Sequence, residues 1–142
     1  MFNSILVVCV GNICRSPIGE RLLKEIYSDK RITSAGLGAL VGQPADPKSV
    51  EVAEKYGISL EGHKAQQLTR ELCMNHDLIL VMENRHIDGV CRIAPEVRGK
   101  VMLFGHWLNR QEIPDPYRQD KKAFEYAYSL LQQSSHLWSK KL

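Results

Sequence analysis

The segment Val7–Pro17 carries the residues best suited to chemistry, because it places Cys9 and Arg15 on one short loop. The aliphatic run Ile5–Val8 before it predicts a strand buried on both faces. Pro17 is expected in the first turn of a helix, where its missing N–H costs nothing. The backbone N–H groups of the loop can then surround an oxyanion at the positive end of a helix dipole. This arrangement predicts a phosphate site with a nucleophile at its base.

Cys9 and Arg15 suit two roles in phosphoryl transfer. A planar guanidinium can bind two phosphate oxygens at once, which the ammonium of lysine cannot. The loop N–H groups, the helix N-terminus and Arg15 favour the thiolate form of Cys9, which is the nucleophile. Ser16 offers a hydroxyl that could stabilise the sulfur as a leaving group. The alternative is a structural cysteine beside a surface arginine. It does not account for a strand, a Gly11–Asn12 turn and a helix start that occur together with this cysteine–arginine spacing.

Asp115 is the candidate general acid and base. It lies between Pro114 and Pro116, so we expect a stiff, extended loop rather than a helix. Such an acid would protonate a leaving oxygen and later accept a proton from water. Taken alone, a Pro-Asp-Pro run is also typical of a surface turn.

Val8–Pro17 resembles the signature loop of the low-molecular-weight protein tyrosine phosphatases, and Asp115-Pro116-Tyr117 resembles that family's acid loop. Larger tyrosine phosphatases share only the spacing of cysteine and arginine, and they usually have a histidine in place of Val8. The resemblance implies a three-layer α/β/α domain over residues 1–142. Its four-stranded parallel sheet would have the order 2-1-3-4, as in the phosphotyrosine phosphatase I-like fold.

The resemblance also implies roles for individual residues. Cys9, Arg15 and Asp115 would be catalytic, with no metal and no cofactor. Ser34 and His63 would support the loop from outside, although His63 alone is more typical of a solvated loop histidine. Leu40 and Tyr117 would form opposite walls of the substrate cleft. The rest of the phosphate-binding loop would be Val10, Gly11, Asn12, Ile13, Cys14 and Ser16.

The similarity extends over the whole chain and is strongest for bacterial members paired with tyrosine autokinases of capsule or exopolysaccharide export, as in the segment Ala94–Gly105. It implies a tyrosine-phosphorylated protein as substrate, with the cognate autokinase as the expected partner. Three alternatives stay open: an arsenate reductase of the same fold, a phosphocysteine carrier, and a non-catalytic phosphotyrosine-binding module. A carrier would lack Arg15 and Asp115, and a reductase would need further cysteines at closer spacing than Cys73 and Cys91.

Length and composition restrict the other possibilities. A chain of 142 residues suits one domain, and its net charge of +3 is scattered, which disfavours nucleic-acid binding. The N-terminal apolar run is too short for a signal peptide or membrane insertion, so we expect a cytoplasmic protein. We also expect a monomer. The four cysteines lack zinc-like spacing. Cys14 is either a packing residue or a partner that traps oxidised Cys9 as a disulfide.

The remaining segments alternate between strands and helices. Strands are expected over residues 31–35, 77–82 and 100–103, with helices over 17–28, 47–56, 68–75 and 83–94 and near the C-terminus. This alternation predicts parallel strands covered on both faces. Ligands of such sheets bind beyond the carboxyl ends of the strands, where Cys9 is expected.

Overall fold

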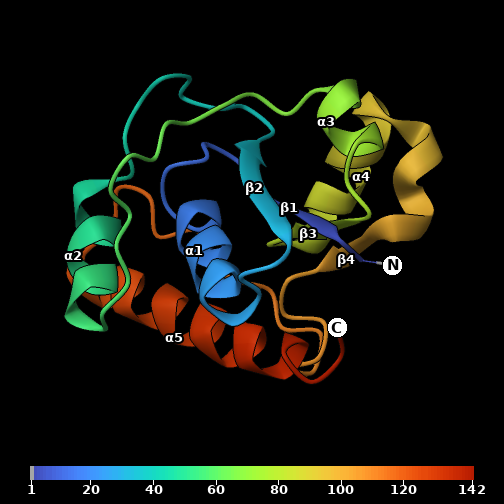
Figure 1. The fold of residues 1–142 in the computed structure, drawn as a ribbon. Coiled ribbons are helices and arrows are strands. Elements are labelled where there is room, and N and C mark those ends of the chain that lie inside the picture. The colour runs from blue at the N-terminus through green and yellow to red at the C-terminus, as the bar shows by residue number, and fades with distance from the viewer. Residues whose placement is uncertain (1) are drawn as a thin grey trace.

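A four-stranded parallel sheet lies at the centre of the computed structural model, which describes residues 2–142 (Figure 1). The strand order is β2-β1-β3-β4, and all three neighbouring pairs are parallel. This confirms the expected fold class and strand order. The strands are β1 (Ser4–Cys9), β2 (Arg31–Gly36), β3 (Leu78–Val81) and β4 (Val101–Leu103).

Helices cover both faces of the sheet. The helices α1, α2 and α5 lie on one side, and α3 and α4 lie on the other (Figure 1). None of the helices within residues 2–142 combines the length and the apolar character needed to cross a bilayer. The helical elements are α1 (Ser16–Ile26), α2 (Pro47–Lys55), α3 (Arg70–Met74), α4 (Asn84–Ile93), the 3-10 helix η1 (Pro95–Lys100) and α5 (Lys121–Trp138).

Local signals set several helix ends. The Asp46 side chain accepts a hydrogen bond from the Lys48 N–H at 2.9 Å and caps α2. Thr69 caps α3 through the Leu72 N–H at 3.2 Å. Gly57, with a φ of 82°, follows the end of α2 in the left-handed conformation that glycine adopts without strain. These boundaries agree with the predicted ones to within two residues or so.

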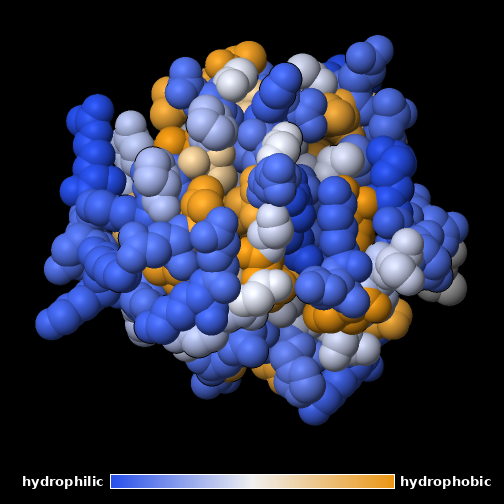
Figure 2. Space-filling view, turned by 60° about the vertical axis from the view of Figure 1, so that its left-hand side comes forward, coloured by the Kyte–Doolittle hydropathy of each residue, from blue (hydrophilic) through white to orange (hydrophobic). Residues whose placement is uncertain are grey.

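The core has two parts, one on each side of the sheet. Alternate residues of β1 point to opposite faces, so Val7 and Cys9 pack with α1 and α5, and Val8 packs with α4. On α1, Ile18, Leu22 and Leu23 are buried against the sheet, and Ile26 is exposed. The face in Figure 2 is mostly hydrophilic, with hydrophobic side chains emerging in small patches.

Candidate active site

Asn12 organises the loop between β1 and α1. It is fully buried and has a φ of 59°, so the left-handed turn falls on Asn12 and not on the neighbouring Gly11. Its Nδ2 donates to Ser16 Oγ at 2.7 Å and to Ser34 Oγ at 3.1 Å. His63 Nε2 donates to the Asn12 carbonyl at 2.6 Å. Ser34 and His63 therefore contact the loop from behind, and both lie outside the lining of the cavity described below.

Glu20 completes this network, and the sequence did not reveal it. The Ser34 hydroxyl donates to Glu20 Oε1 at 2.7 Å, so its lone pairs remain available to the Asn12 amide. Glu20 is buried and pairs through Oε2 with Arg21 at 3.1 Å and Lys24 at 3.2 Å. Asn12 thus donates to Ser34, and Ser34 donates to the Glu20 carboxylate. Because the carboxylate can only accept, the direction of the Ser34 hydroxyl is fixed.

Cys9 lies at the base of the loop with a hydroxyl directed at its sulfur. The Sγ atom is 2.9 Å from Ser16 Oγ, and both groups are buried. Ser16 Oγ already accepts from the Asn12 amide, which can only donate. The Ser16 hydrogen is therefore free to point at Cys9, where it would stabilise a thiolate.

Cys14, the second cysteine of the loop, has a different environment. Burial raises the pKa of its thiol, and the nearby Asp46 carboxylate raises it further. Ser49 Oγ donates to the Cys14 carbonyl at 3.1 Å and fixes the backbone there. Cys14 is therefore held as a neutral thiol, and Cys9 is the cysteine placed to act as a nucleophile.

Arg15 is almost completely buried, with 1% of its surface exposed. Its Nη1 donates to Glu83 Oε2 at 2.6 Å and to the Ile113 carbonyl at 2.7 Å. Its Nη2 is 3.5 Å from Asp115 Oδ2. Within residues 2–142, the buried Nε has no hydrogen-bond partner. A donor left open on a side chain that lines a cavity is what an oxyanion site requires.

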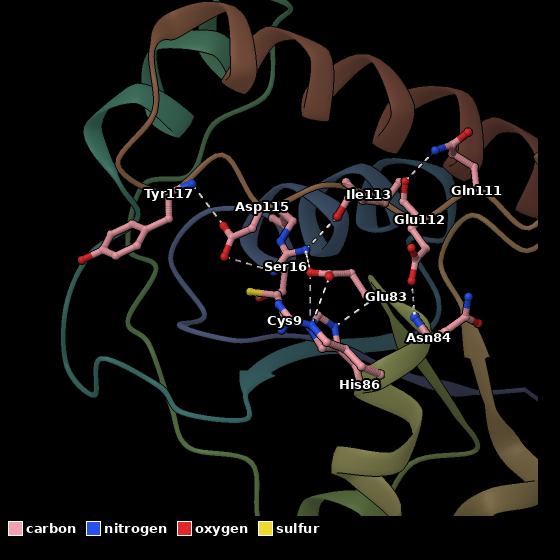
Figure 3. A network of polar contacts seen from close by, with 12 residues as sticks. Cys9, Ser16, Glu83, Asn84, His86, Gln111, Glu112, Ile113, Asp115 and Tyr117 are labelled. Carbon is pink, nitrogen blue, oxygen red and sulfur yellow. Dashed lines mark hydrogen bonds and ion pairs between the residues drawn. The ribbon is translucent and has the colours of Figure 1, made fainter.

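Glu83 and His86 lie close together at the start of α4 (Figure 3), and Glu83 accepts the hydrogen bond from Arg15 described above. Partial burial disfavours a charge on Glu83, but the hydrogen bond and charge of Arg15 outweigh it and lower the pKa of this carboxyl. The Glu83 N–H donates to His86 Nδ1 at 3.2 Å, and His86 Nε2 is 3.5 Å from Glu83 Oε2. Burial and the Arg15 charge lower the pKa of His86 to about 4, so its ring is neutral.

Glu83 was not among the predicted site residues, although its position in the sequence gives a signal for it. Glu83 follows the apolar strand β3 almost directly, and β3 pairs with β1, which carries Cys9. Because the carboxyl ends of parallel strands meet at one edge of the sheet, an acidic residue there was a candidate partner for Arg15.

Asp115 stands above Cys9 in a loop preceding α5 (Figure 3). Its Oδ1 accepts from the Tyr117 N–H at 3.1 Å, which leaves Oδ2 turned toward Arg15. Leu40 and Tyr117 are partly exposed at the rim, as expected for walls of a cleft. Together these groups border a cavity of about 260 Å³, lined by Cys9, Val10, Gly11, Ile13, Cys14, Arg15, Gly38, Leu40, Asp115, Tyr117 and Arg118.

Comparison with known proteins identifies the family of the chain. Residues 4–142 match the family described as low molecular weight phosphotyrosine protein phosphatase. The chain belongs to this family. The match confirms the resemblance drawn from the loop around Cys9 and from the acid loop around Asp115.

Relatives are similar over nearly their full lengths. The low molecular weight protein-tyrosine-phosphatase Wzb of Escherichia coli K12 is 58% identical, covering 100% of this chain and 97% of the relative. Vibrio vulnificus Wzb in complex with benzylphosphonate is 52% identical, covers 100% of both chains and has a TM-score of 0.98. The YwlE arginine phosphatase, in a variant with a phosphorylated active-site serine, is 28% identical, covers 98% of this chain and 95% of that one, and has a TM-score of 0.90.

Proposed function

We propose that the chain hydrolyses phosphotyrosine in proteins through a phosphocysteine at Cys9. The observation that carries the proposal is that Asp115 lines the same cavity as Cys9 and Arg15 of the phosphate loop, although it lies far from them in the sequence. The cavity combines apolar and aromatic side chains, Leu40 and Tyr117, with the phosphate loop, which suits an aryl phosphate. Benzylphosphonate, the ligand of the Vibrio vulnificus relative, has the same combination of ring and phosphoryl group.

The first step transfers the phosphoryl group to the enzyme. Cys9 Sγ attacks phosphorus in line, and the bond from phosphorus to the tyrosine oxygen breaks. Arg15 and the loop N–H groups stabilise the equatorial oxygens, with the open Arg15 Nε as one donor. Asp115, protonated at this stage, gives its proton to the departing phenolate. The contact with Arg15 at 3.5 Å holds the Asp115 side chain over the cavity.

The second step releases phosphate. Asp115, now ionised, takes a proton from water as the water oxygen attacks phosphorus, and the S–P bond breaks. The Ser16 hydroxyl, 2.9 Å from Cys9, stabilises the departing thiolate. A phosphorylated active-site serine in the YwlE variant supports a covalent intermediate at the base of such a loop. In this scheme Asn12, Ser34 and His63 keep the loop in the shape that binds phosphate.

The physiological substrate follows from the family resemblance. We propose a tyrosine autokinase of capsule or exopolysaccharide production, acting in the reducing cytoplasm where the Cys9 thiol persists. The test is a substrate trap: Asp115→Ala protein incubated with tyrosine-phosphorylated proteins of its own cell. Recovery of the autokinase, released by competing vanadate, is the expected result. Recovery of other phosphoproteins without it would contradict the assignment.

The buried cysteines weigh against an arsenate reductase. Cys73 packs in the core on the α3 and α4 side of the sheet, and Cys91 is buried on α4, whereas Cys9 packs on the other side. Burial also raises the pKa of Cys73, which disfavours the thiolate that a disulfide relay needs. Arsenate reduction coupled to thioredoxin would overturn this assignment. A carrier or a binding module would retain bound phosphoryl groups without releasing inorganic phosphate.

Replacing Cys9 and Asp115 separates the two chemical roles. We expect Cys9→Ser to abolish turnover of an aryl phosphate, whereas Cys91→Ser, a change on α4 outside the catalytic cavity, leaves it intact. Asp115→Asn should slow phosphotyrosine hydrolysis by about 100-fold or more, because the phenolate then leaves without a proton. Its effect on p-nitrophenyl phosphate should be smaller, since nitrophenolate leaves easily. Equal losses on both substrates would contradict the role of Asp115 as the acid.

A further inference from the structure

A second hollow adjoins the catalytic cavity on the side of α4. It has a volume of about 510 Å³. Val10 of the phosphate loop lines both the catalytic cavity and this hollow, so the two are neighbours that share one residue. We call it the α4 groove; its walls include Val10, Leu37, Arg85, Gly89, Arg92 and Ile93.

Gly89 gives the α4 groove its shape. Arg85, Gly89 and Arg92 are spaced by four and three residues, so they share one face of α4. A Cβ atom at position 89 would lie 3.1 Å from Leu37 Cδ1, closer than ordinary packing allows. A glycine inside a helix costs roughly 1 kcal/mol relative to alanine. Here it lets Leu37 close one wall of the groove while the two arginines flank the opening.

The α4 groove is basic. Arg85 and Arg92 are both exposed; Arg85 pairs with Glu83 Oε1 at 3.1 Å, and Arg92 has no ion pair within residues 2–142. Asp88 of the same helix faces Arg98, whose Nη2 is 3.6 Å from Asp88 Oδ1. The neighbouring His86 is neutral, because burial and Arg15 lower its pKa to about 4. Arg92 therefore lies beside the groove as an exposed cation that makes no ion pair with the described residues.

We propose that the α4 groove binds acidic residues next to the phosphotyrosine of the substrate, a specificity that rests on the proposed function. When the phosphate of a peptide is bound to the loop, the residues next to the phosphotyrosine must extend across the rim of the cavity. Val10 lies on the part of this rim that borders the groove. Arg118, which lies over the Tyr117 ring at 5.2 Å, also lines the catalytic cavity and adds positive charge to it. Carboxylates flanking the phosphotyrosine complement this charge, whereas lysines and arginines would be repelled.

The test compares three phosphotyrosine peptides of equal length. One has neutral flanks, one has glutamates before the phosphotyrosine, and one has glutamates after it. The wild type, Arg92→Glu and Lys140→Glu are assayed on all three, and on p-nitrophenyl phosphate, which fills only the catalytic cavity. Lys140 is exposed beyond the end of α5, so its reversal changes the net charge equally without touching the groove.

We expect the wild type to prefer at least one acidic peptide over the neutral one by roughly fivefold in kcat/KM, mainly through KM, as for exposed charge pairs. Arg92→Glu should abolish or reverse this preference while p-nitrophenyl phosphate turnover is kept, and Lys140→Glu should preserve it. High salt should weaken it. Equal rates on all three peptides would overturn the groove proposal and leave the proposed function standing, whereas no hydrolysis of any peptide would overturn both.

Discussion

Arg15 combines near-complete burial with a full positive charge, and three acceptors compensate that charge. Glu83 Oε2 and the Ile113 carbonyl bind one end of the guanidinium, and Asp115 approaches the other. The buried Nε has no hydrogen-bond partner within the described residues, and Nη2 has only the longer contact with Asp115 at 3.5 Å. The guanidinium is thus fixed in orientation before any phosphate arrives, which is the preorganisation that charge stabilisation in a transition state requires.

Replacing Glu83 with glutamine tests this arrangement. We expect Glu83→Gln to lower the free energy of unfolding by about 3 kcal/mol, because it leaves a buried cation without its carboxylate. The freed guanidinium should also lower kcat/KM by about 100-fold through misplacement. Urea denaturation and steady-state kinetics measure the two effects. Glu112→Gln is the matched control, since Glu112 accepts from the Asn84 N–H of the same helix at 2.7 Å.

At the scale of elements, the loop after β1 is held by the end of β2. Gly36 closes β2, and a Cβ there would lie 2.4 Å from the Val10 carbonyl oxygen and 3.0 Å from the Asn12 N–H nitrogen. Strand and loop can approach this closely only because position 36 has no side chain. The site therefore depends on the packing of β2 as well as on its own residues.

We expect Gly36→Ala to lower the free energy of unfolding by about 3 kcal/mol and to reduce activity, because the backbone of the loop must move. Gly38→Ala is the matched control, since a Cβ at position 38 meets nothing within 4 Å. Chemical denaturation of the two variants compares their stabilities. Similar stability of Gly36→Ala and Gly38→Ala would contradict the close approach of the end of β2 to the loop after β1.

The elements were more predictable from the sequence than their mutual contacts. Helix caps such as Asp46 and Thr69 act on N–H groups two or three residues away, so the sequence states them directly. The strand order and the support from Ser34 came from family resemblance. Glu83 reaches Arg15 across 68 residues of sequence, a contact that exists only once β1 and β3 pair. No pattern of neighbouring residues predicts a contact between residues this far apart in the sequence.

At the scale of the whole molecule, two buried histidines couple folding to pH. His76 donates through Nδ1 to the Leu72 carbonyl at 2.7 Å, and its Nε2 lies 2.6 Å from Thr33 Oγ1 and 3.1 Å from Arg31. Burial lowers the pKa of His76, and burial with the Arg15 charge lowers that of His86 to about 4. Both rings are therefore held neutral in the folded state, at opposite ends of the sheet.

This coupling predicts a loss of stability in mild acid. A histidine with a pKa below its unfolded value of 6.5 stabilises the fold fully above that value, and the contribution falls as the pH drops toward the folded pKa. For His86, the free energy of unfolding should drop by about 2 kcal/mol between about pH 7 and about pH 5. His86→Gln keeps an acceptor for the Glu83 N–H and should remove this part of the pH dependence.

Urea titrations at the two pH values measure the slope for each protein. His136→Gln is the control, because its side chain is exposed on α5 and its replacement leaves both buried histidines in place. His76 should account for a further part of the acid sensitivity, since protonation of its Nε2 would replace an acceptor with a donor facing Arg31. If His86→Gln and the wild type lost equal stability on acidification, this would contradict the claim that the buried His86 ring is neutral in the folded state.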